Sequence, residues 1–157
     1  MEVRKIRAEM RNGRSFYDMP LRVTFYARVS TDQDDQISSL ENQVQYYTEL
    51  IQSRPNWRFV PGYVDEGISG GSTKKRDNFN RMIRDAKAGM FDFIITMEIS
   101  RFSRSTLDSI KYTQELLDYN VGVFFQNDNI NTLDTDSEFR LVIMAGVARD
   151  EIRKLSE

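Results

Sequence analysis

Cysteine and histidine are both absent from this chain of 157 residues. Without cysteine, the chain can form no disulfide and offers no thiolate ligand to a metal. Without histidine, it has no Ser-His-Asp triad, no imidazole ligand for zinc and no imidazole general base. A nucleophilic serine in this chain would therefore depend on arginine or on a carboxylate for its activation.

Long apolar runs are also missing. No stretch approaches the roughly 20 apolar residues that are needed to span a bilayer, and the amino terminus lacks the apolar segment of a signal peptide. Together with the lack of cysteine, these features predict a cytoplasmic protein without a membrane partner.

An excess of basic residues is the third feature that the chain lacks. Lysine and arginine number 22 against 24 acidic residues, for a net charge of −2. A DNA-binding domain that acts alone is usually basic, so this balance argues mildly against nucleic acid. The charges are segregated, with basic clusters at residues 1–22, 74–87 and 98–104 and acidic clusters at residues 32–35, 65–66 and 128–138. A local basic surface is compatible with this pattern.

Strand-like and helix-like stretches alternate along the chain. Strands are expected at residues 21–27, 57–60 with 63–64, 91–97 and 121–125. Helices are expected from the capping-box sequence at 38–41 to Pro55, at 77–87, from 105 or 106 to 119, and from about 136 to at least 155. The polar residues 126–135 are expected to form a loop. The alternation predicts the α/β class, with an open, mainly parallel sheet flanked by helices and a long C-terminal helix.

Residues 1–20 show no clear apolar period and end at Pro20. They are expected to form an N-terminal extension without a defined helix. The domain itself is expected to comprise residues 21–157.

Arg28 and Ser30 lie at the end of the first predicted strand. Residues two apart in an extended chain point the same way, so a guanidinium and a hydroxyl would project together from the strand tip. A hydroxyl beside a cation suggests attack on an anion, for which phosphate is the obvious candidate. The pair is also compatible with a plain strand end, where the serine bonds nearby backbone and the arginine is solvated.

Arg101 and Arg104 lie three apart where the third predicted helix begins, and this spacing puts them on one face. An anion bound there would meet both guanidinium groups and the helix N-terminus. The alternative is a pair of surface arginines on either side of a buried Phe102. Ligands of open parallel sheets bind beyond the carboxyl ends of the strands, which is where the Arg28–Ser30 pair and the Arg101–Arg104 pair are both expected.

Two weaker candidates lie near the same edge. The glycine-rich loop of residues 65–76 ends in Lys74, Lys75 and Arg76, but it is equally compatible with a solvated loop. Gln43 follows the capping box by about one turn, which would bring its amide near the first strand tip, although glutamine is also an ordinary solvated helix residue. No Walker A or GxGxxG pattern supports nucleotide binding.

Taken in order along the chain, these segments resemble the serine recombinases of the resolvase/invertase family. The matching motifs are residues 26–33 (YARVSTDQ), 65–70 (DEGISG), 76–79 (RDNF), 101–104 (RFSR) and 147–151 (VARDE). The resemblance covers residues 21–157. Many members of the family have Asp-Arg where this chain has Ser100-Arg101, whereas large serine recombinases often read SRFSR. The chain therefore resembles the large serine recombinases or their transposon-borne relatives.

The resemblance implies that Ser30 attacks a DNA phosphodiester, forms a 5′-phosphoserine link and releases a 3′-hydroxyl, after which strands are exchanged and rejoined. The further implied site residues are Arg28, Arg101 and Arg104 as phosphate ligands, Gln43 and Arg76 as supporting residues, and Glu151 in the long helix. Neither a metal nor a cofactor is implied. The expected partners are double-stranded DNA and further copies of the chain, as a homo-dimer and a synaptic homo-tetramer, for a transposon or prophage. DNA-recognition domains are expected after residue 157.

Two other interpretations of the residues stay open. The same strand ends could hold a small anion in a regulatory α/β domain that performs no covalent chemistry. Alternatively, Asp65, Glu66 or Asp92 could ligate Mg²⁺ in a nuclease, although the arginines would then have no clear role. Since Ser100 replaces an acid found in many family members, the base that accepts the Ser30 proton is not assigned.

Overall fold

The structure, a computed structural model, describes residues 2–30, 34–67, 76–103, 105–134 and 141. The predicted long C-terminal helix lies outside the described residues except for Leu141, which is buried in the core. Within the described part of the chain, no helix is long and apolar enough to cross a membrane.

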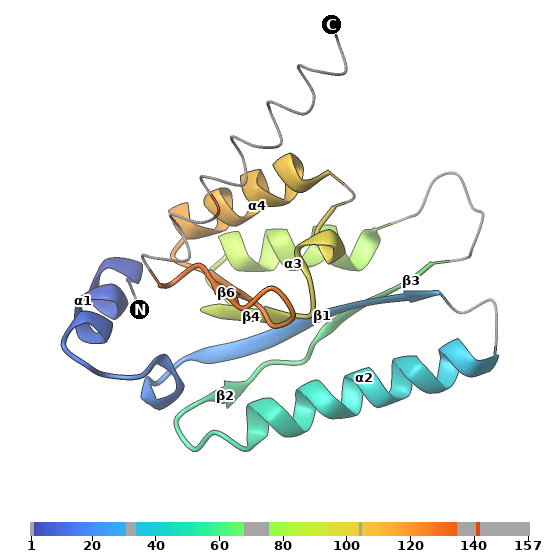
Figure 1. Cartoon of the computed structure of the whole chain (residues 1–157), viewed down its shortest axis with the longest axis horizontal. Coiled ribbons are helices and arrows are strands. Elements are labelled where there is room, and N and C mark those ends of the chain that lie inside the picture. The colour runs from blue at the N-terminus through green and yellow to red at the C-terminus, as the bar shows by residue number, and fades with distance from the viewer. Residues whose placement is uncertain (1, 31–33, 68–75, 104, 135–140, 142–157) are drawn as a thin grey trace, which may run out of the picture.

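A mainly parallel sheet with the strand order β2-β1-β4-β5-β6 forms the centre of the domain (Figure 1). The strands are β1 (Arg22–Ser30), β2 (Arg58–Phe59), β3 (Tyr63–Gly67), β4 (Phe93–Thr96), β5 (Gly122–Phe125) and β6 (Ile130–Asn131). β1 pairs in parallel with β2, β3 and β4, and β4 pairs in parallel with β5. The predicted open, mainly parallel α/β fold is thereby confirmed.

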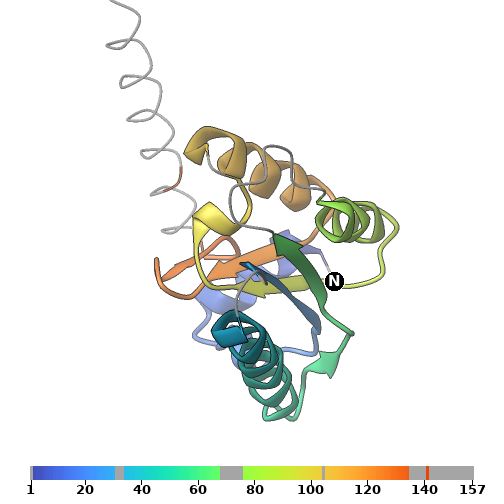
Figure 2. The same cartoon turned by 90° about the vertical axis from the view of Figure 1, so that its right-hand side faces the viewer.

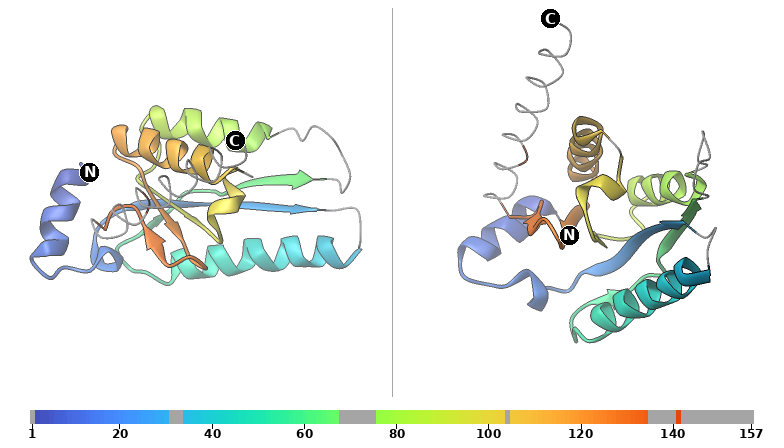
Figure 3. Two further views of the ribbon diagram at one scale, coloured as in Figure 1. Left: turned by 45° about the horizontal axis from the view of Figure 1, so that its top comes forward. Right: turned by 45° about the vertical axis from the view of Figure 1, so that its right-hand side comes forward.

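Helices flank the sheet on both sides (Figures 2 and 3). They are α1 (Val3–Arg11), α2 (Asp34–Gln52), α3 (Asp77–Lys87) and α4 (Thr106–Asp118), with short 3-10 turns η1 (Phe16–Asp18) and η2 (Ile99–Arg101). Successive strand residues face opposite sides, so β1 serves two cores. Phe25 packs in one core with Tyr47 of α2, and Tyr26 packs in the other with Phe79 of α3.

The helices predicted at 77–87 and after 105 are confirmed as α3 and α4. α3 buries the apolar stripe that its sequence predicts, and Gly89 follows it with a positive φ of 77°, a conformation that glycine adopts without strain. The hydroxyl of Ser105 accepts a hydrogen bond from the Asp108 N–H and caps α4. These helices form where the sequence predicts them because their caps and apolar faces are local features.

The N-terminal segment differs from its prediction, because residues 3–11 form the helix α1. Val3 and Ile6 are buried, and full burial of a side chain such as Ile6 contributes about 1.5–3 kcal/mol. The Arg7 side chain donates hydrogen bonds to the carbonyls of Thr132 and Leu133, and the Val3 N–H donates to Asn120 Oδ1. Contacts more than 100 residues away thus support a helix whose own apolar pattern is sparse.

Two other boundaries also differ from the predictions. α2 begins at Asp34, so the presumed capping box at residues 38–41 lies inside the helix. The predicted loop at 126–135 contains β6, which pairs antiparallel with β5. A two-residue strand is too short to show alternation in the sequence.

β1 is longer than the predicted strand of residues 21–27 and continues to Ser30. Residues 23–25 pair with β4, whereas residues 26–30 pair with β3, as far as Ser30 opposite Gly67. Among the described residues, no strand pairs with the other side of the β1 tip. Two side chains reach this side instead, one from the last residue of β4 and one from η2.

Candidate active site

The carboxyl ends of β1, β3 and β4 meet at one edge of the sheet, as the sequence predicts for its ligand-binding edge (Figure 1). On the open side of the β1 tip, Thr96 Oγ1 donates to the carbonyl of Tyr26 at 2.9 Å. Arg101 Nη1 donates to the carbonyl of Arg28 at 2.8 Å. Thr96 at the end of β4 and Arg101 in η2 thus satisfy carbonyls of the β1 tip that no described strand pairs with, and Arg101 is a predicted phosphate ligand.

Arg76 connects the start of α3 to the same turn. Its Nη2 donates to the carbonyl of Arg101 at 2.9 Å, and its Nη1 donates to the carbonyl of Phe102. Its guanidinium carbon lies 3.8 Å from the centre of the Phe79 ring, a distance typical of a cation–π contact. In this structure Arg76 therefore supports the backbone that carries Arg101.

Arg28, Arg76 and Arg101 form what we call the arginine cluster. Within the described ranges, no ion pair joins any of the three to a carboxylate. Arg28 and Arg101 therefore offer positive charge to an anion at the strand edge, and guanidinium groups bind two phosphate oxygens at once. The Arg76 guanidinium is instead occupied by the Phe79 ring and two backbone carbonyls. Arg28 and Arg101 are each partly exposed, so an anion from solvent can reach this edge.

Asp65 secures the start of α3 to the sheet. Its carboxylate is 5% exposed and accepts hydrogen bonds from the Tyr26 hydroxyl at 2.8 Å and from the backbone N–H groups of Asn78 and Phe79 at 3.1 and 3.0 Å. The pKa of Tyr26 is raised to about 12, mainly by burial; Arg76 opposes the rise and the hydrogen bond to Asp65 adds to it. The carboxylate thus caps α3 from a neighbouring strand and helps to position Arg76.

The carboxylates proposed as metal ligands do not lie together. Asp65 already accepts three hydrogen bonds, whereas Asp92 lies at the amino end of β4 beside Arg22. Arg22 and Arg28 are six residues apart on β1, about 20 Å along an extended strand. The described residues hold no group of three acidic side chains that could bind a metal ion. The geometry therefore does not support the nuclease interpretation.

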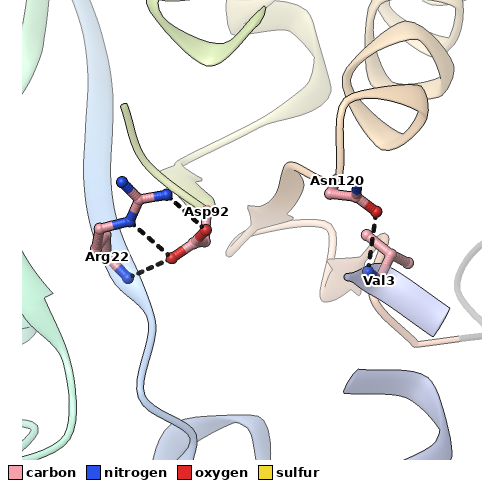
Figure 4. Close-up of polar contacts among 4 residues, drawn as sticks. All are labelled: Val3, Arg22, Asp92 and Asn120. Carbon is pink, nitrogen blue, oxygen red and sulfur yellow. Dashed lines mark hydrogen bonds and ion pairs between the residues drawn. The ribbon is translucent and has the colours of Figure 1, made fainter. Parts of the chain in front are cut away.

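Asp92 has a structural role at the opposite end of the sheet (Figure 4). Its carboxylate accepts hydrogen bonds from the Arg22 backbone N–H at 2.9 Å and from the Arg22 guanidinium at 3.1 and 3.2 Å. Burial opposes ionisation of Asp92, but these contacts with Arg22 outweigh it and lower the pKa of the carboxyl. A cavity of about 270 Å³ lies beside the pair, and Asn120 and Tyr119 also line it.

Replacement of Asp92 by asparagine is expected to lower the free energy of unfolding at pH 7 by about 1.5–3 kcal/mol, the range for hydrogen bonds to a charged group. The folded-state pKa of Asp92 is depressed, so its contribution is present above the unfolded value near 4 and is lost as the pH falls through the folded value. Urea denaturation at pH 7 and in acid measures both effects. The exposed Asp118→Asn is the control, and equal stability of the two variants at pH 7 would contradict the assignment.

Glu98 is a residue of this edge that its sequence context does not single out. It accepts hydrogen bonds from the Ser100 hydroxyl at 3.1 Å and from the Asn127 amide at 3.3 Å. The Asp128 carboxylate accepts from the Ile99 N–H at 2.9 Å. Asn127 and Asp128, which lie between β5 and β6, thus hold the turn that precedes Arg101. The carboxylate beside the Ser100 hydroxyl is that of Glu98, two residues earlier in the chain.

The remaining predicted site residues are placed less completely. Gln43 is partly buried on α2, and no hydrogen bond joins its side chain to the arginine cluster within the described ranges. Ser30 is placed by its backbone at the tip of β1, while its side chain, Arg104 and Glu151 lie outside the described part. The structure therefore brings together Arg28, Arg76 and Arg101, and the neighbourhood of Ser30 is defined by its position two residues after Arg28.

The fold and this edge define a class of protein, namely α/β domains in which arginine residues gather where parallel strands end. Residues 23–157 match the family model "Resolvase, N terminal domain", and the chain belongs to this family. A search of curated proteins found no match.

Solved structures are similar to the chain over most of its length. A resolvase family site-specific recombinase from Streptococcus pneumoniae is 26% identical with a TM-score of 0.65, over 86% of this chain and 93% of that one. The N-terminal catalytic domain of TP901-1 integrase is 24% identical with a TM-score of 0.60, over 87% and 99%. The C-terminal catalytic domain of ISC1926 TnpA, an IS607-like serine recombinase, is 21% identical with a TM-score of 0.55, over 66% of each chain. The TP901-1 integrase and ISC1926 TnpA domains are each less than 25% identical to this chain, so their similarity shows a shared fold and nothing further.

Proposed function

We propose that this chain is the catalytic domain of a serine-type site-specific DNA recombinase, in which Ser30 is the nucleophile. The observation that carries the proposal is the arginine cluster beside the tip of β1, in a chain of the Resolvase family. Ser30 follows Arg28 by two residues on the same strand, so the predicted nucleophile belongs to the edge where an anion would bind. The name of the relative from Streptococcus pneumoniae, a site-specific recombinase, also supports this function.

The proposed reaction exchanges one phosphodiester for another. The Ser30 oxygen attacks the phosphorus, the bond from phosphorus to the 3′ oxygen breaks, and the 3′ oxygen leaves as a hydroxyl after taking up a proton. The serine proton is released in the same step, and the products are a 5′-phosphoserine and a free 3′-hydroxyl. Attack of a 3′-hydroxyl from another strand reverses the chemistry and frees the serine.

Arginine suits the charge changes in this reaction. The pentacoordinate phosphorus carries more negative charge on its oxygens than the starting diester does, and guanidinium groups held in advance stabilise that charge. Arg28 and Arg101 are the described candidates for direct contact, with Arg104 and Gln43 proposed beside them. Arg76 acts through the backbone of Arg101 in the present structure.

The partners and the biological setting are also part of the proposal. The substrate is double-stranded DNA that carries a recombination site, and the active assembly is a synaptic tetramer formed from two dimers. Integrase and IS607-like recombinase domains among the similar folds support a role in a transposon or prophage. The cytoplasm is the compartment in which this DNA would be met.

The covalent intermediate provides the test. The full-length protein is mixed with DNA from the flanks of its coding gene and with a genomic fragment library, and the products are denatured and treated with nuclease. We expect a nucleotide attached through a 5′-phosphate to Ser30, located by mass spectrometry, and formed equally well with or without chelator. DNA cleavage that stops with chelator and leaves no adduct would favour a metal nuclease, and absence of both cleavage and adduct would favour an anion-binding regulatory domain.

A further inference from the structure

The helix α1 concentrates positive charge in a chain that is acidic as a whole. Residues 2–14 contain five basic and two acidic side chains, so this segment has a net charge of +3. The whole chain has a net charge of −2, which leaves −5 for the other residues. A local excess of basic residues is the electrostatic footprint of contact with a polyanion, and the fold decides which anion can reach it.

Three of the α1 cations face solvent without an acidic partner. Arg4, Lys5 and Arg11 are exposed, and none of them forms an ion pair with any residue that the structure describes. Arg14 differs from them, because it pairs with Glu9 at 2.8 Å. We call Arg4, Lys5 and Arg11 the α1 basic surface. An anion from solvent can bind there without first breaking an ion pair.

The stability of the helix does not account for this surface. The first turn of α1 holds Arg4 and Lys5 and no acidic residue, and the side chain of the N-cap residue Glu2 makes no capping hydrogen bond. Positive charge in the first turn opposes the helix dipole and is unfavourable for folding. These two cations thus lower the stability of α1, and a role in binding an anion explains why they are there.

The contacts that hold α1 on the domain leave its basic surface outside. Val3 and Ile6 are buried, and Arg7 donates hydrogen bonds to the carbonyls of Thr132 and Leu133. A nine-residue helix is too short to be stable alone in water, so these contacts fix its place. An interfacial helix binds a membrane by inserting its apolar face, and here that face is already inside the domain. The geometry therefore favours a nucleic acid over a lipid surface.

The spacing of the cations suits the phosphates of a DNA duplex. Arg4 and Arg11 lie seven residues apart, which puts them on the same side of α1 and about 10 Å apart along its axis. Phosphates of one strand of B-DNA follow each other at about 3.4 Å along the duplex axis, so this distance spans about three base pairs. Lys5 widens the basic surface beside Arg4.

We propose that the α1 basic surface is a second contact surface for double-stranded DNA, in which Arg4, Lys5 and Arg11 bind backbone phosphates. The inference rests on the proposed function, which names DNA as the substrate. α1 lies at the end of β1 that is remote from Ser30 (Figure 1), and β1 extends about 20 Å between Arg22 and Arg28. The phosphates at α1 are therefore different from the one that Ser30 attacks.

The salt dependence of DNA binding tests this proposal. The full-length protein and a variant with Arg4→Gln, Lys5→Gln and Arg11→Gln are titrated with a duplex of unrelated sequence at several salt concentrations. We expect the slope of log K against log salt to fall by about two to three, because each lost phosphate contact removes about 0.9. Affinity in 0.1 M salt should fall at least about tenfold. The same loss is expected on the fragment that forms the Ser30 adduct, because phosphate contacts carry no sequence information.

Two further variants separate position from charge. Arg58→Gln, Arg84→Gln and Lys111→Gln together remove three exposed cations from β2, α3 and α4, and should change the slope by less than one. Arg4→Lys with Arg11→Lys keeps the charges and should keep the wild-type slope. The thermal unfolding midpoint of the α1 variant should equal or exceed that of the wild type, because two cations that oppose the helix dipole are gone.

The outcomes distinguish this surface from the proposed function. Equal slopes for the wild type and the α1 variant, with a Ser30 adduct in the wild type, would overturn the surface and leave the proposed function standing. The expected fall in slope without any Ser30 adduct in the wild type would support the surface and refute the proposed function. If the α1 variant instead loses binding to phosphatidylserine vesicles and keeps its DNA slope, the partner is a membrane and the proposal is wrong.

Discussion

Ser30→Ala is expected to abolish both the covalent DNA adduct and strand cleavage, with a loss of at least about 10⁴-fold in rate, as for other enzymes that lose their nucleophile. The chain contains no cysteine or histidine that could take over the nucleophilic role. The arginine cluster can still hold a phosphate in the variant, but it has no oxygen to place on the phosphorus. DNA binding by the full-length protein should therefore be retained while the chemistry is lost.

The rate is measured by quantifying adduct and cleaved strands on the fragment that reacts with the wild-type protein. Ser53→Ala is the matched control, because Ser53 is exposed, its hydroxyl donates to the Leu50 carbonyl, and it lies just beyond the C-terminal end of α2. Retention of full strand exchange by Ser30→Ala would refute the proposed mechanism. Adduct formation on another residue, with Ser30 unmodified, would refute the assignment of the nucleophile.

Arg101→Ala is expected to lower the cleavage rate at least about 100-fold, the effect of losing one donor that stabilises charge in a transition state. The fold should persist, because Arg76 donates to the backbone carbonyls of Arg101 and Phe102, which the substitution keeps. The bond to the Arg28 carbonyl is lost, at a cost of about 1 kcal/mol in the free energy of unfolding. Arg101→Lys restores the charge but not the planar fork, so it should recover only part of the rate.

Cleavage rates and urea denaturation of the same preparations test this expectation. Arg84→Ala, on the exposed side of α3, is the control for removal of one positive charge. A loss of more than about 3 kcal/mol in the free energy of unfolding would mean that Arg101 is structural. Unchanged cleavage by Arg101→Ala would mean that it does not meet the phosphate.

Local patterns predict much of this fold. α3 carries its apolar stripe from Phe79 to Ala86, and Gly89 follows it, so its prediction needs no knowledge of the rest of the chain. The apolar residues of β4 and of β1 can likewise be recognised as strands from the local sequence alone. Parallel topology then brings the strand ends to one edge, which is why residues far apart in sequence could be assigned to one site.

Contacts between distant segments decide what local patterns do not show. α1 has few apolar residues of its own, and its place depends on Asn120 and on the carbonyls of Thr132 and Leu133. The sequence places Asp65 at the start of a glycine-rich loop, yet Asp65 lies on β3 and caps a helix that begins 12 residues later at Asp77. No periodicity within either segment reveals such a partner, because the energy of the contact comes from the other segment.

The sequence by itself determined the α/β class, the α3 and α4 helices, and the presence of a serine and several arginines at the ends of strands. Those properties depend on apolar spacing, caps and residue type within short windows. Only the tertiary structure decided that Arg76 supports the backbone of Arg101 and that Asp65 is a helix cap. Hydrogen bonding and burial at these positions depend on which segments meet in space, and that is a property of the packed chain.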